Sequence, residues 1–356
     1  MTPFPMGKWG RGVALGLAAA PYLTPAKILN LLRCEAEKAR RVARPRAFPY
    51  TAIIDVTNTC NLRCPYCPTG YPRDSGRTKS MIDLALVAKL IHEIGDYLVS
   101  AVLFNWGEPL LHPQIAAIVK MFHTKRIFTS ISTNLNTRNK KVMEEVIEAG
   151  LDYLTVSFSG VTQEVYEQYH RRGRFDLLRE NLIRIRDYKR KHNLRKPILE
   201  LKFLRFQYNR HEVEPARRLA AELGAEIFNN FPAGGAQEVI VGPDKDPPKF
   251  FPVFHCCHQL WHAVVLNADG GVAPCCYLFF KKDDLGDFAR NSLREIRNSR
   301  TYVTARQLFD AGAVANLPRD LQHPCLKCHL VHEQQHLSNY LRSNPHAKQD
   351  HRTGGP

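Results

Sequence analysis

The stretch CNLRCPYCPTG, residues 60–70, carries three of the chain's ten cysteines at the spacing C-x3-C-x2-C. Three thiolates can hold three irons of a [4Fe–4S] cube and leave the fourth iron open to a ligand from outside the protein. Catalytic metal sites keep such an open position, whereas structural sites close it. A zinc knuckle with a distant fourth ligand, or a half-assembled redox motif, would also explain three cysteines, so the surrounding sequence must decide.

The composition limits the class of protein. With 356 residues, 44% of them hydrophobic, the chain can form one large α/β domain and a smaller one. The formal net charge of +16 favours anionic partners, namely lipid, phosphorylated substrates or nucleic acid. No nucleic-acid recognition motif accompanies the charge, so nucleic acid is not expected as a partner. Cysteines grouped in a long chain indicate metal ligands in a reducing, cytoplasmic compartment, with Cys34 a simple buried or semi-exposed thiol.

Residues 1–49 predict basic amphipathic helices. Ile28, Leu31 and Leu32 fall on one helical face, and lysines and arginines surround them. This pattern is typical of a helix that lies on an anionic membrane surface. Alternatively, the apolar face packs on the protein itself. The mild apolar run at residues 13–23 is too short to span a bilayer, which takes about 20 apolar residues.

Residues 50–232 alternate strand-like and helix-like segments six times, which predicts a partial (β/α)6 TIM-like barrel. Unusual residues fall where these strands end: the cysteine loop after the first, NWGEP (105–109) after the second, and Thr133 with Asn134 after the third. SFSG (157–160) ends the fourth strand. Because the carboxyl ends of parallel barrel strands converge, these features are expected to form one site.

Together these motifs resemble the radical S-adenosylmethionine (SAM) superfamily, whose signature loop is similar to CNLRCPYC. The resemblance implies that Cys60, Cys64 and Cys67 bind a [4Fe–4S] cluster and that SAM chelates its open iron. An electron passed from an external donor such as flavodoxin or ferredoxin then cleaves SAM, and a 5′-deoxyadenosyl radical abstracts hydrogen from the substrate.

The same resemblance implies a set of SAM contacts. NWGEP is similar to the family's GGEP stretch; Gly107 and Glu108 match it, whereas Asn105 and Trp106 replace its opening. The residues implied to hold SAM are Tyr66, Asn105, Gly107, Glu108, Thr133, Asn134 and Ser157. Ser159-Gly160 lacks the acid that often ends the fourth strand, so no role is carried over to Ser159. No catalytic acid or base is identified.

The cysteines after residue 254 indicate a second, small cysteine-rich domain. The segment VVLNADGGVAPCC predicts a β-hairpin. The spacing resembles a SPASM/twitch domain, which implies one auxiliary [4Fe–4S] cluster on Cys257, Cys275, Cys325 and Cys328. Cys256 and Cys276 are spare by this resemblance; each could exchange with its neighbour, bind nothing or contact the substrate. Four cysteines also suit zinc. We expect a linker at 233–253, the auxiliary domain at 254–337 and a flexible tail at 338–356.

The substrate is harder to predict. The 49 residues before Tyr50 are too few for the peptide-docking region of peptide maturases, which favours a small, anionic, glycan- or lipid-linked substrate. His170–Arg174 could bind phosphate or form a solvated basic loop. One alternative is a maturase of ribosomal peptides. Another is a non-catalytic zinc or iron–sulfur scaffold, for which the open cysteine site and Glu108 would have no use. The sequence thus predicts a cytoplasmic enzyme, and contact with a membrane surface is one of the two hypotheses for its N-terminal helix.

Overall fold

The computed structural model describes residues 15–65, 67–70, 74–233, 257–318 and 320–328. Within these residues one open sheet has the strand order β6-β5-β4-β3-β2-β1-β7-β8-β9. The strands are β1 (Thr51–Ile54), β2 (Ser100–Val102), β3 (Phe128–Thr133), β4 (Tyr153–Phe158), β5 (Ile198–Arg205), β6 (Ile227–Pro232), β7 (Ala263–Leu266), β8 (Gly271–Ala273) and β9 (Gly286–Asp287). The expected linker (apart from Ala233), the tail, Tyr66 and Cys256 lie outside the described residues.

Strands β1 to β6 are parallel and adjacent in chain order, which confirms the partial barrel. The connecting helices are α3 (Leu84–Ile94), α4 (Ile115–Thr124), α5 (Val142–Glu148), α6 (Gln163–Tyr169), α7 (Phe175–Lys191) and α8 (Val213–Glu222). Helix α3 illustrates the packing: Asp83 caps it, and Val87, Leu90 and Ile94 form its buried stripe. This spacing is what a helix needs to cover one face of a sheet.

The two faces of β5 differ in chemistry. Leu199, Leu201 and Phe203 belong to the main core that the helices cover. Glu200 points to the other face, where it accepts hydrogen bonds from Tyr153, Thr155 and Asn229 at 2.7, 3.1 and 2.6 Å. The barrel interior is therefore partly polar.

The described part of the N-terminal segment packs at the amino ends of the barrel strands. Residues 15–19 are helical and lead into η1 (Ala20–Tyr22). Tyr22 packs with Phe128, Tyr153 and Ile227 in a separate apolar cluster, and its hydroxyl donates to the buried Asp152. This cluster lies at the end of the sheet opposite the cysteine loop, because Phe128, Tyr153 and Ile227 each begin a strand. Helix α2 (Pro25–Ala39) follows.

The C-terminal domain continues the barrel sheet. Strands β7 and β8 form the expected antiparallel hairpin, and β9 extends it. β7 also pairs in parallel with β1, from Thr51 opposite Ala263 to Ile54 opposite Leu266, which nothing in the sequence indicated. Its helices are α10 (Gln259–His262), α11 (Leu293–Arg297), α12 (Arg300–Gln307) and α13 (Ala311–Val314).

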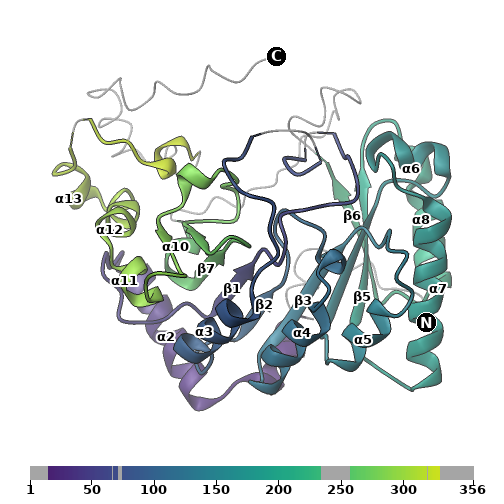
Figure 1. The fold of residues 1–356 in the computed structure, drawn as a ribbon, viewed down its shortest axis with the longest axis horizontal. Helices are drawn as coiled ribbons and strands as arrows, with labels where there is room; N and C mark the ends of the chain where they lie inside the picture. Colours follow the sequence, from purple (N-terminus) through teal and green to yellow (C-terminus); the bar gives the residue numbers. More distant parts are fainter. Residues whose placement is uncertain (1–14, 66, 71–73, 234–256, 319, 329–356) are drawn as a thin grey trace.

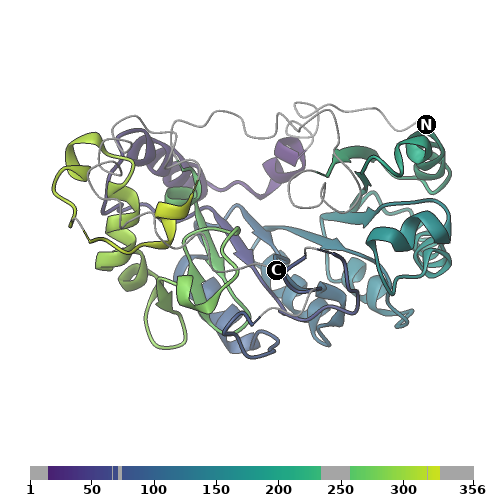
Figure 2. The ribbon, with the colours of Figure 1, turned by 90° about the horizontal axis from the view of Figure 1, so that it is seen from above.

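Figures 1 and 2 show that this domain lies at the end of the molecule opposite α6, α7 and α8. Strand β1 joins the cysteine loop to the auxiliary domain. The cysteine loop follows β1 in the chain, and β7 of the auxiliary domain is hydrogen-bonded to β1. None of the described helices has the length and apolar composition needed to cross a membrane.

Candidate iron–sulfur and SAM site

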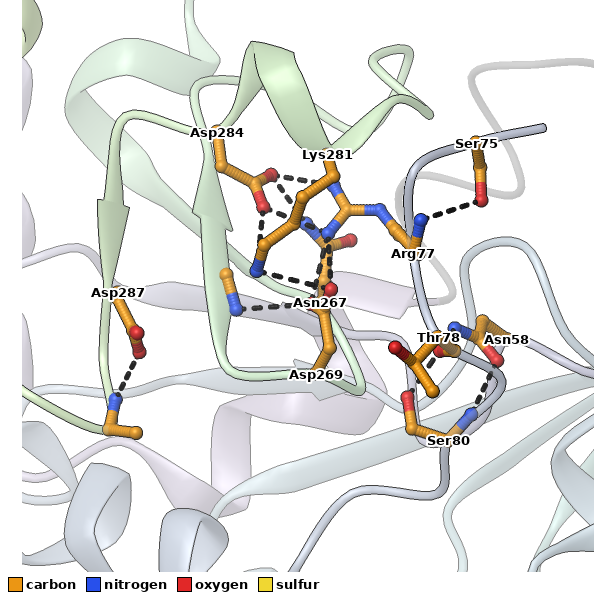
Figure 3. Close-up of polar contacts among 12 residues, drawn as sticks. Asn58, Ser75, Arg77, Thr78, Ser80, Asn267, Asp269, Lys281, Asp284 and Asp287 are labelled. Carbon is orange, nitrogen blue, oxygen red and sulfur yellow. Dashed lines mark hydrogen bonds and ion pairs between the residues drawn. The ribbon is translucent and has the colours of Figure 1, made fainter.

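The cysteine loop leaves β1 and returns to its starting point before α3. At its base Asn58 pairs with the returning chain: its Nδ2 donates to the Thr78 carbonyl at 2.8 Å, and its Oδ1 accepts from the Ser80 N–H at 2.9 Å (Figure 3). Thr57 and Met81 form a β-bridge at the same level. The segment that carries Cys60, Cys64 and Cys67 is thus held at both ends.

The three thiols interact with one another. Burial raises the pKa of Cys60 to about 11, and the proximity of Glu108 and Cys67 adds to this. Burial also raises the pKa of Cys64, with Cys67 and Cys60 contributing. Such thiols ionise when a cationic metal group joins them. Among the described residues no three side chains have single-ion ligand geometry. Three neighbouring thiols are the donor set that a [4Fe–4S] cluster with one open iron uses, so the residues present fit that group.

The loop closes tightly around Cys64 and Cys60. A Cβ on Gly70 would lie 2.8 Å from the backbone N and O of Cys64, so only glycine fits there. The Sγ of Cys60 receives the N–H of Leu62 at 3.4 Å and the side-chain amide of Asn134 at 3.7 Å. Hydrogen bonds of this kind stabilise thiolate character.

The NWGEP turn packs on the start of the cysteine loop. The buried carboxylate of Asp55, directly after β1, accepts from the N–H groups of Trp106 and Gly107 at 3.1 and 3.2 Å. A Cβ on Gly107 would lie 1.7 Å from the carbonyl oxygen of Thr57, which requires glycine. Burial raises the pKa of Asp55 to about 6, although these N–H groups oppose the shift. Asp55 was not recognised from the sequence.

Glu108 is fully buried and engaged by the chain. Its carboxylate accepts from the Thr133 hydroxyl at 2.6 Å, the Asn134 N–H at 2.8 Å and the Leu110 N–H at 3.1 Å. Burial raises its pKa against these hydrogen bonds. Glu108 therefore ties the NWGEP turn to the end of β3 and fixes Asn134 beside Cys60.

Two predicted positions at the fourth strand differ in environment. Ser157 is half-buried on β4, directly opposite Lys202 in the sheet register. Ser159 is fully buried, donates to the Tyr166 carbonyl at 3.1 Å and contacts His170 Nδ1 at 2.7 Å. Ser159 thus holds the following helix. Ser157 lies two residues after Thr155, whose hydroxyl donates to Glu200, so it is on the strand face that lines the barrel interior.

The auxiliary cysteines lie near one another. Burial, together with Cys257, Cys276 and Cys328, raises the pKa of Cys275 to about 12. Burial also raises the pKa of Cys325, and the nearby thiols of Cys275, Cys257 and Cys328 raise it further. Cys276 also lies close to Cys275, but its own Sγ and N–H are both hydrogen-bonded to the amide of Gln259, at 3.3 and 3.0 Å. The four implied ligands therefore lie near one another, and Cys276 differs from them by its contact with Gln259.

The unusual residues of the NWGEP turn face the C-terminal domain. With its amide oriented to suit its neighbours, Asn105 donates to the Cys276 carbonyl at 3.2 Å and accepts from Trp106 Nε1 at 2.9 Å. The ring of Trp106 meets Phe279 edge-on, with centroids 5.3 Å apart. Asn105 and Trp106, the two residues that replace the usual family opening, thus both contact the C-terminal domain.

Arg77 forms a second link between the catalytic loop and the auxiliary domain, and the sequence did not reveal it. Its guanidinium binds both oxygens of Asp284, at 2.6 and 2.8 Å, and Asp269 at 2.9 Å (Figure 3). Its side chain is 3% exposed, and Nε donates to the Phe279 carbonyl at 2.9 Å. Such bidentate ion pairs fix geometry as well as charge.

An open three-cysteine loop at the mouth of a partial barrel, with a second cysteine group beside it, defines an iron–sulfur protein of the partial-barrel class. The radical SAM superfamily model matches residues 54–195. The model of SPASM, an iron-sulfur cluster-binding domain, matches residues 256–329. Residues 54–195 thus belong to the radical SAM superfamily, and residues 256–329 form a C-terminal SPASM domain. These domains imply a SAM-binding [4Fe–4S] cluster and auxiliary iron–sulfur binding, as expected.

Curated relatives match only part of their length. GTP 3',8-cyclase of Chlorobaculum tepidum is 32% identical over 133 residues, which are 37% of this chain and 39% of that protein. PqqA peptide cyclase of Bradyrhizobium diazoefficiens is 29% identical over 128 residues, 36% of this chain and 33% of that protein. The matched region thus spans about two fifths of these relatives or less.

Solved structures show the same fold. Streptococcus suis SuiB bound to precursor peptide SuiA has a TM-score of 0.57 at 13% identity, covering 85% of this chain and 74% of SuiB. Native anSMEcpe with bound AdoMet has a TM-score of 0.53 at 14% identity, covering 72% of this chain and 84% of that one. At such identities the likeness concerns the fold alone.

Proposed function

We propose that this protein is a radical SAM enzyme that oxidises or rearranges a small, anionic, glycan- or lipid-linked substrate. The cluster and SAM supply a 5′-deoxyadenosyl radical when bound, and an external donor such as flavodoxin or ferredoxin supplies the electron. The observation that carries the proposal is the three-thiol loop, held at both ends beside Asn134 and the NWGEP turn.

The chain's own residues have distinct tasks in this proposal. Asn134 and Ser157 contact SAM, and Thr133, Asn105, Gly107 and Tyr66 are assigned to SAM binding by the resemblance. Glu108 shapes this site because its carboxylate fixes the Asn134 backbone. Among the described residues Oε2 accepts one hydrogen bond, from the Asn134 N–H, and its second lone pair can receive the SAM ammonium.

The high positive charge and the exposed apolar face of α2 support a lipid-linked, anionic substrate and peripheral membrane contact of a cytoplasmic enzyme. A second candidate is peptide maturation. It is supported by the PqqA peptide cyclases among the relatives and by SuiB, whose structure holds its precursor peptide.

Anaerobic reconstitution tests the activity. Two clusters predict about eight irons per chain, and dithionite with SAM should yield 5′-deoxyadenosine. A Cys60/Cys64/Cys67→Ala variant should lose that product and about half of the iron, whereas Cys34→Ala, which removes a buried thiol in α2, should lose neither. Zinc in place of iron, without SAM cleavage, would refute the proposal in favour of a scaffold.

Deuterium transfer identifies the substrate class. Cells grown in deuterated medium supply separate lipid, glycan and peptide fractions, and each is incubated with the reduced enzyme and unlabelled SAM. Deuterium in 5′-deoxyadenosine from the lipid or glycan fraction supports the proposal. Deuterium from the peptide fraction alone would replace it with peptide maturation.

A further inference from the structure

Helix α2 exposes the side of the helix that is usually buried. Three large apolar side chains are in solvent: Ile28 (44% exposed), Leu29 (61%) and Leu32 (60%). Lys27, Asn30 and Cys34 instead form its buried side. A helix on the surface of a globular protein normally turns its apolar stripe to the core. The sequence alternative in which the apolar face packs on the protein is therefore wrong for Ile28 and Leu32.

Specific polar contacts fix α2 in this orientation. The Asn30 amide forms two hydrogen bonds with the backbone of Phe48, each 2.9 Å long. Glu37 accepts the N–H groups of Arg46 and Ala47 at 3.1 and 3.0 Å, and the buried Lys27 ammonium donates to the carbonyl of Arg126. Rotating the helix to bury its leucines would break all of these, so the apolar face stays outside.

The exposed face also carries positive charge. Arg33 and Arg40 are exposed and follow Leu29 at intervals of four and eleven residues, which places them on the same side of α2. Arg44 and Arg46, just beyond the helix, are exposed as well. Apolar side chains flanked by arginines are the combination that inserts between lipid tails while binding acidic headgroups.

We propose that the outer face of α2, defined by Ile28, Leu29, Leu32, Arg33 and Arg40, docks on an anionic lipid bilayer. The formal net charge of +16 favours this partner over a second copy of the chain, because two such copies repel. The inference rests on the membrane contact in the proposed function and gives it a surface and a lipid class. Membrane docking is measured without enzyme activity, so failure of the docking proposal and failure of the proposed enzymatic function are distinguished by separate experiments.

Vesicle flotation with the full reconstituted protein measures the docking. Vesicles of phosphatidylcholine alone are compared with vesicles containing phosphatidylglycerol, at low and high salt. Leu29→Gln/Leu32→Gln should weaken binding to the anionic vesicles about tenfold or more. Arg33→Gln/Arg40→Gln should weaken it by about fivefold for each arginine and reduce its salt dependence. Leu194→Gln, an exposed apolar residue (37%) outside α2, is the matched control and should bind as the wild type does.

Iron content and thermal unfolding establish that each variant is folded. Binding that is absent, that survives the leucine substitutions, or that is equally strong on neutral vesicles would overturn the proposal. So would a concentration-dependent dimer in light scattering that Leu29→Gln/Leu32→Gln abolishes, since that result assigns the face to a second copy.

Discussion

Arg77→Gln should destabilise the junction between the catalytic loop and the auxiliary domain. The substitution removes the cation that faces Asp269 and Asp284, whose side chains are 14% and 7% exposed. Breaking a buried pair by removing one partner costs about 3–5 kcal/mol, because the stranded charge stays buried. Lys281 lies 3.1 Å from Asp269 and compensates in part, so we expect about 3 kcal/mol. Arg77→Lys should recover only part of this, because lysine cannot form the fork.

The loss should depend on pH. In the wild type burial would raise the pKa of Asp269, but Arg77 and Lys281 lower it below its usual value. Its stabilising contribution is thus present above the unfolded pKa of about 4 and is lost as the pH falls through the folded value. Without Arg77 the buried carboxylates gain affinity for protons, so the variant should be less impaired at pH 5 than at pH 8.

Anaerobic urea unfolding, followed by tryptophan emission at both pH values, measures the effect. With a slope of about 3 kcal/mol per molar urea, the midpoint should fall by about 1 M at pH 8. The matched control is Arg290→Gln, which breaks the Arg290–Asp287 pair in the same domain, where Arg290 is 84% exposed; it should cost at most about 1 kcal/mol. A midpoint shift no larger than that of the control, or one independent of pH, would refute the reasoning.

Three further outcomes follow from the site. Cys275→Ser should lose the auxiliary cluster, about half of the iron, whereas Cys276→Ser should keep it; equal iron loss in both would contradict the ligand assignment. Gly107→Ala places a methyl group 1.7 Å from a backbone carbonyl oxygen, so 5′-deoxyadenosine formation should fall about 100-fold. The control is Gly16→Ala, which has open space around it and should leave 5′-deoxyadenosine formation unchanged. Asp55→Asn keeps a hydrogen-bond acceptor but removes a carboxyl group whose pKa burial raises to about 6. The stability of the variant relative to the wild type should therefore rise between about pH 4 and pH 6, by at most about 3 kcal/mol. A difference in urea midpoint that does not change with pH would contradict this.

Local patterns in the sequence were sufficient for much of the site. The cysteine spacing, the NWGEP turn and the Thr133-Asn134 pair each lie within a few residues of a strand end, and strand periodicity is readable locally. Their convergence followed from the known geometry of parallel barrels. The sequence could not separate Cys275 from Cys276, because neighbouring residues share one loop and only the packing of Gln259 distinguishes them.

The sequence by itself determined the barrel class, the open three-cysteine loop and the hairpin of the auxiliary domain, because these depend on short-range periodicity and spacing. Only the tertiary structure decided three further features: the pairing of β7 with β1, the partners of Arg77, and the outward direction of the apolar face of α2. Asp269 and Asp284 lie 192 and 207 residues beyond Arg77 in the chain. Contacts at such separations depend on how the whole sheet assembles, and a short stretch of sequence does not record them.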